Sequence, residues 1–490
     1  SMSAEMVKNP VELMSLGHRS NEYWRFNGKA FAGIELWEGL KFQTSLAYAF
    51  DLNATKSYTP KSPARYDADG NIVKAAGETN KEEDYWYRNA TWTNENLLTY
   101  NKQFDKHNIN VLLGHSVIGS RFYKTTASIQ GFPTENIYEL KGGTINPGAT
   151  GESEEYKLQS FFGRVNYSYD DRYLFEFNIR HDGSSRMPKA NRYATFPSLS
   201  AGWVFSNEGF MKDYRNFSLG KLRLSWGKLG NNSIGDYEWQ ATYSGSNYIF
   251  GDKLTSGLAQ TVIANQKLRW ESVTQTNIGL DFAILNNRLV GEFDIYNKVT
   301  DGILYRPGVY ATMGNKTPAR QNYAEVTNKG VEFTLNWNDR VNEWSYSFSG
   351  NFSYNKNLVS KFKGALKKGW EYDENGSYIY KSNLGDVSDG GDNRIIEGHI
   401  INEYYLKEPY KGDATYFFNN GLVNPTGGPK DGMIRTEQDM QWLKAMQDQG
   451  YVFYPNQKIG KANLWYGDYI YADINGDGLY GNEILSLANL

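Results

Sequence analysis

Apolar and polar residues alternate along much of this chain. In residues 344–355 one set of alternate positions holds Trp, Tyr, Phe and Gly, and the other set holds only Ser and Asn. The same period of two is present in residues 173–180, 222–227, 278–282 and 331–338. A period of two places successive side chains on opposite faces of a β-strand. The pattern therefore predicts an all-β fold built from strands with one apolar and one hydrated face.

The links between these strands are alternately short and long. Short links are expected at residues 37–39, 170–172, 285–288 and 338–343, and long links at 51–85, 119–157, 181–196, 230–271 and 298–327. Such a pattern puts turns at one end of a sheet and loops at the other, as in outer-membrane barrels with short periplasmic turns and long extracellular loops. We therefore predict an antiparallel transmembrane β-barrel with apolar faces toward lipid and Ser/Asn faces toward the lumen.

A soluble sandwich or propeller also alternates with a period of two. In such a protein the polar face meets bulk water and is rich in Lys and Glu, whereas several polar faces here hold Ser, Asn and Gly. The apolar faces are rich in Tyr, Trp and Phe, which are enriched at membrane interfaces. The alternative to the barrel is a soluble secreted β-protein that binds or hydrolyses glycans.

Composition excludes several other classes of protein. Aromatic residues make up 15% of the 490 residues, which argues against disorder, and the absence of Cys excludes a disulfide-stapled module. The 52 basic and 55 acidic residues nearly cancel, so we expect no nucleic-acid partner. No segment approaches the roughly 18 to 20 apolar residues of a membrane helix, and residues 1–6 do not resemble a signal peptide. The mean hydropathy of −0.64 does not bear on membrane strands, which alternate.

The strand rhythm suggests two regions. Residues 1–355 are expected to hold barrel strands with short periplasmic turns and long extracellular loops. Residues 356–490 are expected to be mainly an extracellular loop region. In that second region a capping-box pattern at Thr436–Asp439 predicts one short helix at about 437–449, and an Asp-rich turn follows at 473–478.

Ten short motifs, spread over nearly the whole chain, resemble those of one family and follow its order. They are SFFGRVNY at 160–167, RHDGSSR at 180–186, NRY at 191–193, FPSLSAGW at 196–203, LRLSWG at 222–227, LRWE at 268–271 with TQTNIGLDF at 274–282, NNRL at 286–289, DIYNK at 294–298, NKGVEF at 328–333 and DINGDG at 473–478. In this order they are similar to the SusC-like TonB-dependent outer-membrane transporters, also known as the RagA/SusC type.

The resemblance implies a portion of a 22-stranded barrel in a bacterial outer membrane. It implies active import of oligosaccharides or peptides and no enzymatic activity. The implied partners are a SusD-like surface lipoprotein that closes as a lid, and TonB, which acts through a region absent from this chain. The motifs cover an internal barrel portion, so the expected chain lacks the plug and the C-terminal strands of the family.

One segment has the residue types of a calcium loop. Asp473, Asn475 and Asp477 occupy its first, third and fifth positions, Gly478 the sixth, and Leu479 would offer a backbone carbonyl at the seventh. The bidentate acid belongs at position twelve, but Glu483 stands one place early. We therefore expect either a Ca²⁺ site at Asp473, Asn475, Asp477, Leu479 and Glu483, or an Asp-rich turn without metal.

No catalytic constellation is readable. His181, Asp182 and Ser184 are too close in sequence to form a hydrolase triad, so a turn is expected there. A glycosidase needs two carboxylates on one cleft, and the strand acids stand singly on different strands: Glu176, Asp281, Glu292, Asp294 and Glu332. Aromatic residues in or beside predicted long loops can stack on sugars or pack the loops together: Trp86, Trp92, Tyr237, Trp239, Tyr243 and Tyr248. No substrate-binding residue is assigned from the sequence.

Overall fold

The computed structural model describes most of the chain. The described residues are 17–61, 65–66, 72–74, 79–211, 213–214, 216–306, 316–362, 368–372, 378–382, 393–394, 397–401, 403–455, 458–461, 463–474, 476–481 and 485–486. The chain forms two compact units, Ser1–Tyr296 with Glu332–Phe352, and Asn297–Val331 with Ser353–Leu490.

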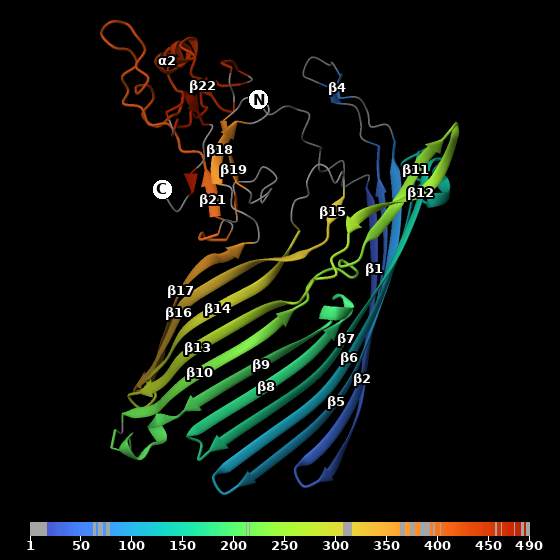
Figure 1. Cartoon of the computed structure of the whole chain (residues 1–490), viewed down its shortest axis with the longest axis vertical. Coiled ribbons are helices and arrows are strands. Elements are labelled where there is room, and N and C mark those ends of the chain that lie inside the picture. The colour runs from blue at the N-terminus through green and yellow to red at the C-terminus, as the bar shows by residue number, and fades with distance from the viewer. Residues whose placement is uncertain are drawn as a thin grey trace. The chain divides into compact units, whose positions relative to one another are not determined.

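Twelve antiparallel strands form one sheet in the order β1-β2-β5-β6-β7-β8-β9-β10-β13-β14-β16-β17 (Figure 1). Each of these strands therefore pairs with the sheet strands before and after it in the chain. The short strands in the loops are not part of this sheet. The twelve are β1 His18–Trp37, β2 Leu40–Thr59, β5 Lys81–Phe104, β6 His107–Gln130, β7 Ile145–Tyr169, β8 Tyr173–Ser184, β9 Tyr193–Trp203, β10 Phe217–Asn231, β13 Glu271–Ile284, β14 Leu289–Tyr305, β16 Gln321–Val341 and β17 Trp344–Phe362. The all-β prediction is confirmed, and strand β17 ends at Phe362 rather than near Asn355.

Short elements occupy the links and the region after β17. The strands are β3 Arg65–Tyr66, β4 Ile72–Lys74, β11 Thr242–Phe250, β12 Lys253–Ile263, β15 Thr317–Pro318, β18 Lys368–Tyr372, β19 Tyr378–Ser382, β20 Asn393–Arg394, β21 Glu403–Leu406, β22 Val452–Phe453, β23 Leu479–Tyr480 and β24 Leu485–Ser486. The helices are α2 Glu437–Asp448 and the single 3-10 turns η1 Leu140–Gly142, η2 Lys189–Asn191, η3 Phe205–Asn207 and η4 Gly209–Met211. Among the described helices, none is long and apolar enough to cross a bilayer.

The predicted short links contain tight turns, and the link between β5 and β6, which was not predicted, is another. Gly39, Asp105, Asp170, Asn286 and Asn342 all have a positive φ. Gly takes this conformation freely, and Asp and Asn tolerate it better than other residues. The alternation of turn and loop therefore comes from local turn residues at one end of the sheet.

The long links are shorter than predicted. Strands β5, β6 and β7 are 24, 24 and 25 residues long, so residues 51–59, 81–85, 119–130 and 145–157 are strand, not loop. The β5–β6 register is continuous to the strand tips, where Lys81 pairs with Gln130, and the β6–β7 register shifts only between Ser128 and Gln130. Thr, Ser, Lys and Glu fill these tips, so the apolar alternation fades while the backbone ladder continues. About 9 to 11 residues span a membrane, so more than half of each of these strands extends beyond it.

The two faces of the sheet differ as the sequence predicts. We define the outer face as the one that carries Phe175, Phe177 and Ile179, and the inner face as the one that carries Glu176 and Asn178. The three outer-face side chains are 49%, 43% and 42% exposed. A buried core face would show values near zero. The outer face of the described sheet is therefore an extended apolar surface, which lipid would cover.

Aromatic rows mark the two edges of this apolar band. Register places Phe104, Tyr169, Tyr173 and Trp203 in or beside one row near the short turns. Phe161, Tyr193 and Trp92 lie 8 to 12 residues farther along their strands on the same face. With a rise of about 3.3 Å per residue and a strand tilt of about 40°, the band is roughly 20 to 30 Å tall. This height matches the apolar band of outer-membrane barrels.

The second unit contains a small core around α2. Trp442, Leu443 and Met446 of the helix are fully buried with Ile434, and the Trp442 indole donates to the Asn424 carbonyl at 2.7 Å. Thr436 caps the helix, and its hydroxyl accepts from the Asp439 N–H at 3.1 Å. The helix lies within the predicted range of 437–449 because the capping box fixes its first turn.

Candidate functional site: the polar inner face

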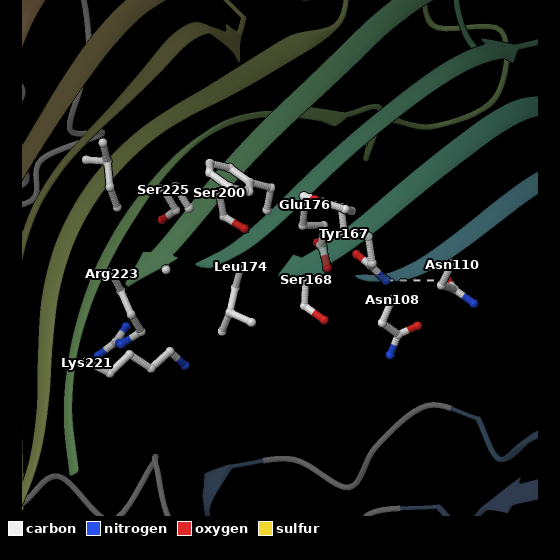
Figure 2. A pocket seen from close by; sticks show the side chains of 15 residues that line it. Asn108, Asn110, Tyr167, Ser168, Leu174, Glu176, Ser200, Lys221, Arg223 and Ser225 are labelled. Atoms are coloured by element: carbon white, nitrogen blue, oxygen red, sulfur yellow. Dashed lines mark hydrogen bonds between the residues drawn. The ribbon is translucent and has the colours of Figure 1, made fainter. Parts of the chain in front are cut away.

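A hollow of about 580 Å³ lies on the inner face of strands β6 to β10. Figure 2 shows labelled side chains from neighbouring strands, and register places all of them except Tyr167 on the inner face. They are mostly hydrogen-bonding groups: Asn108, Asn110, Ser168, Glu176, Ser200, Lys221, Arg223 and Ser225. The inner face thus presents donors and acceptors to the lumen, as the Ser/Asn pattern predicts.

Arg223 ties three strands together beside this hollow. Its guanidinium Nε donates to Asp281 Oδ1 at 2.8 Å, and Nη2 donates to Asp294 Oδ2 at 3.0 Å. Asn277 Nδ2 donates to the other Asp294 oxygen at 2.8 Å. Lys221 lies 3.8 Å from Asp281. One guanidinium therefore holds two carboxylates of strands β13 and β14, in a charge-assisted arrangement.

Gly279 makes this crossing feasible. Gly279 pairs directly with Arg223 across β10 and β13. A Cβ atom at this position would lie 2.6 Å from Arg223 Cζ and 2.5 Å from Asp294 Oδ1. Only a residue without a side chain lets the guanidinium cross β13 to reach β14.

The sequence did not reveal this network. Asp281 and Asp294 were expected to stand singly, but the register brings both to Arg223. The available signal was Arg223 itself, a cation between Leu222 and Leu224 in a strand of the apolar rhythm. A charge inside a membrane strand needs partners on the same face.

A second polar ladder lies on strands β7 to β9. Asn178 Nδ2 donates to Glu176 Oε1 at 2.7 Å and to Ser198 Oγ at 3.3 Å. Arg180 donates to both Asp182 oxygens at 2.8 Å and to Ser160 at 2.8 Å. These inner-face groups hydrogen-bond to one another, so the charged side chains of this ladder all have partners.

The residues of the apparent triad point to opposite faces. His181 lies on the outer face, where its Nδ1 is 2.9 Å from Thr195 Oγ1, and Asp182 pairs with Arg180 on the inner face. Strand β8 also continues through Ser184, so the expected turn starts later than His181. A strand cannot bring these side chains together for nucleophilic catalysis.

The Asp-rich segment forms a tight turn around the Asp473 carboxylate. Its oxygens accept the backbone N–H groups of Gly476 at 2.7 Å, Asp477 at 3.2 Å and Gly478 at 2.8 Å. Leu479 N–H donates to Asp477 Oδ1 at 2.8 Å. Asn475 and Glu483 lie outside the described residues. Within the described part of the chain no three His, Cys, Asp or Glu side chains form a metal-binding group. The Ca²⁺ site stays a prediction.

The aromatic residues expected near loops take different places. Trp86 and Trp92 lie on strand β5 and are not in a loop. Tyr237 and Trp239 attach their loop to its surroundings: the Tyr237 hydroxyl accepts from the Glu155 N–H of β7 at 3.1 Å, and the Trp239 indole donates to Ser185 O at 3.4 Å. Tyr243 and Tyr248 stand exposed on the hairpin arm β11–β12.

Comparisons with known proteins agree with this geometry. Residues 14–480 match the family model described as "TonB dependent receptor-like, beta-barrel". TonB-dependent receptor P3 of Formosa agariphila is 35% identical over 363 residues, which cover 72% of this chain and 35% of that protein. TonB-dependent receptor SusC of Bacteroides thetaiotaomicron is 32% identical over 349 residues, covering 67% of this chain and 34% of that protein.

Solved structures give the same result. The structure of the RagAB peptide transporter superposes with a TM-score of 0.69 at 26% identity, over 82% of this chain and 42% of that one. The chain spans about a third of the length of the curated relatives it matches.

Proposed function

Since this chain belongs to the TonB-dependent receptor-like β-barrel family, of the SusC-like type, and is an outer-membrane protein, we propose that it forms the wall of an active importer of oligosaccharides or peptides. The observation that carries the proposal is the division of one sheet into an exposed apolar outer face and a polar inner face. Such a sheet separates lipid from an aqueous path.

The proposed mechanism is a two-state opening. A SusD-like surface lipoprotein closes over substrate at the long-loop end, and TonB then draws a plug out of the lumen. The inner face described above would line the path that opens. Its Asn, Ser, Glu and Arg groups offer hydrogen bonds to sugar hydroxyls and to peptide backbones alike, so both substrate classes stay in the proposal.

We propose transport without chemistry on the substrate. A soluble glycan-cleaving β-protein would bury its apolar face and expose paired carboxylates in a cleft. Here the apolar face is open, and the two inner-face carboxylates that come together are both held by Arg223. Carboxylates neutralised in this way are poor general acids and bases.

Uptake by whole cells tests the proposal. A strain that lacks the gene and the same strain complemented with it would be given mixed oligosaccharide and peptide pools, and depletion of each pool would be followed by mass spectrometry. We expect faster depletion of one class in the complemented strain, and loss of that difference when the proton-motive force is collapsed. Uptake independent of the energy source, or cleavage by purified protein, would contradict an importer of this kind.

A further inference from the structure

Three basic side chains gather on the outer face just beyond the apolar band. They are Lys157 on β7, Arg121 on β6 and Arg88 on β5, and all three are exposed. Lys157 pairs with Gly119, and Arg121 pairs with Ala90. In this register Arg88 and Lys157 are both diagonal neighbours of Arg121, at a spacing of about 7 to 8 Å.

The indole of Trp92 indicates where these basic side chains lie along the membrane normal. Trp92 pairs with Gly119, so it shares a row with Lys157. A Cβ at Gly119 would lie 2.5 Å from the Trp92 ring, which shows that the indole lies flat over Gly119. Trp sits at the level of lipid headgroups. Lys157 is therefore near that level, and the rows of Arg121 and Arg88 follow at intervals of about 5 Å.

Among the described residues, the positive charge of this patch is only partly balanced by acidic side chains. Glu155 lies 3.4 Å from Arg121, but this pair is exposed, with 72% of the Arg121 side chain accessible. Arg88 stacks over the Tyr123 ring at 5.3 Å, which neutralises no charge. The remaining acids on this face of β5, Asp84 and Glu82, stand farther from the band, and Glu82 is fully buried.

The inner face at the same height is different. There Thr91, Ser120 and Asn89 form a neutral chain of hydrogen bonds at 2.9 and 3.0 Å. Lys124 faces Glu152 at 3.9 Å. Among the described residues of β5, β6 and β7 at this height, the excess of cations therefore lies on the lipid-facing side. Cations this close repel one another, and a further anion bound between them would relieve that repulsion.

We propose that Lys157, Arg121 and Arg88 bind the phosphate groups of an outer-leaflet glycolipid whose acyl chains lie along the apolar band below. The occupant must be amphipathic, because an apolar surface and an indole lie directly beneath the cations. Arg in particular forms bidentate bonds with phosphate. The site rests on the outer-membrane location of the chain and does not depend on what the transporter imports.

Binding of lipid A to the intact transporter, purified from outer membranes in mild detergent, tests this site. The probes are bis-phosphorylated lipid A, the same lipid after removal of both phosphates, and inorganic phosphate as competitor. The test variant is Arg88→Gln/Arg121→Gln/Lys157→Gln. The matched control is Lys124→Gln, which removes a cation three residues from Arg121 on the opposite face. Retained heat-modifiable gel migration verifies that each variant is folded.

We expect the triple variant to bind bis-phosphorylated lipid A about a hundredfold more weakly, since each basic residue near an anionic lipid surface contributes roughly fivefold. The Lys124→Gln protein and the unmodified protein should bind it equally. Dephosphorylated lipid A should bind weakly to every variant. Equal binding by the triple variant, tight binding of dephosphorylated lipid A, or displacement by millimolar inorganic phosphate would each overturn the proposal.

Discussion

Phe177→Arg tests the assignment of the outer face to lipid. Phe177 stands midway between Tyr173, in the lower aromatic row, and His181, where polar residues begin. With a rise of about 2.5 Å per residue along the membrane normal, its ring is roughly 10 Å from either edge of the band. An Arg at this depth on the lipid side costs about 2 to 4 kcal/mol. We therefore expect the free energy of unfolding to fall by about 3 kcal/mol.

Two controls make the result specific. Asn178→Arg places the same side chain one residue away on the inner face, where its guanidinium can donate to Glu176 as the Asn178 amide now does at 2.7 Å. Its effect should be below about 0.5 kcal/mol. Tyr173→Arg keeps the lipid face but moves to the edge of the band, and should cost about 0 to 1 kcal/mol.

The measurement is denaturant unfolding of the intact transporter in lipid vesicles, followed by Trp fluorescence and heat-modifiable gel migration. We expect Phe177→Arg to lower the free energy of unfolding most, Tyr173→Arg less, and Asn178→Arg least. Equal destabilisation by Phe177→Arg and Asn178→Arg would refute the face assignment. Equal effects at Phe177 and Tyr173 would refute the position of the band along the strands.

Three further predictions concern the inner wall and the second unit. Gly279→Val should displace Arg223 from Asp294 and cost about 1 to 3 kcal/mol by overpacking, as measured by denaturant unfolding, whereas Gly245→Val, at a glycine with open space, should not. Burial alone would raise the pKa of Asp439, but hydrogen bonds from the Arg435 and Thr436 N–H groups and the Tyr416 hydroxyl hold that pKa below its usual range. Its stabilisation is therefore present above about pH 4 and lost as the pH falls through the lowered pKa. Asp439→Asn should destabilise the unit around α2 by about 1 kcal/mol at pH 7, with a smaller difference near pH 3, while the exposed Asp448→Asn should have little effect in the same thermal melts. If the Asp-rich loop holds Ca²⁺, millimolar Ca²⁺ should raise the Tm of the native protein and not of Asp477→Asn; no shift in the native protein would leave only the turn around Asp473.

The period of two is a local property, so the sequence alone determined much of the sheet. The assignment of Phe175, Phe177 and Ile179 to one face and of Glu176 and Asn178 to the other is confirmed, because alternation fixes the face of each side chain once a strand forms. The tight turns are confirmed for a similar reason. Asp and Asn residues accept the left-handed backbone that those turns require.

The lengths of the strands could not be predicted from the alternation of apolar and polar residues. The tips of β5, β6 and β7 hold polar residues on both faces, so no apolar rhythm marks them. They are strand because each backbone pairs with a neighbour up to Lys81 and Gln130. Backbone hydrogen bonding does not depend on side-chain type, and a long ladder is therefore invisible to a hydrophobic pattern.

For the charged groups too, the sequence shows which strand each residue lies on, and only the fold shows which residues meet. The sequence places Arg223, Asp281 and Asp294 on three strands, and it places Arg88, Arg121 and Lys157 on three others. Which of these residues become neighbours depends on register, and a shift of one residue would send each to the opposite face. The sequence by itself determined strands, faces and turns, because these follow from local preference. Only the tertiary structure decided the Arg223 network and the basic patch, because both are made by pairing between segments distant in the chain.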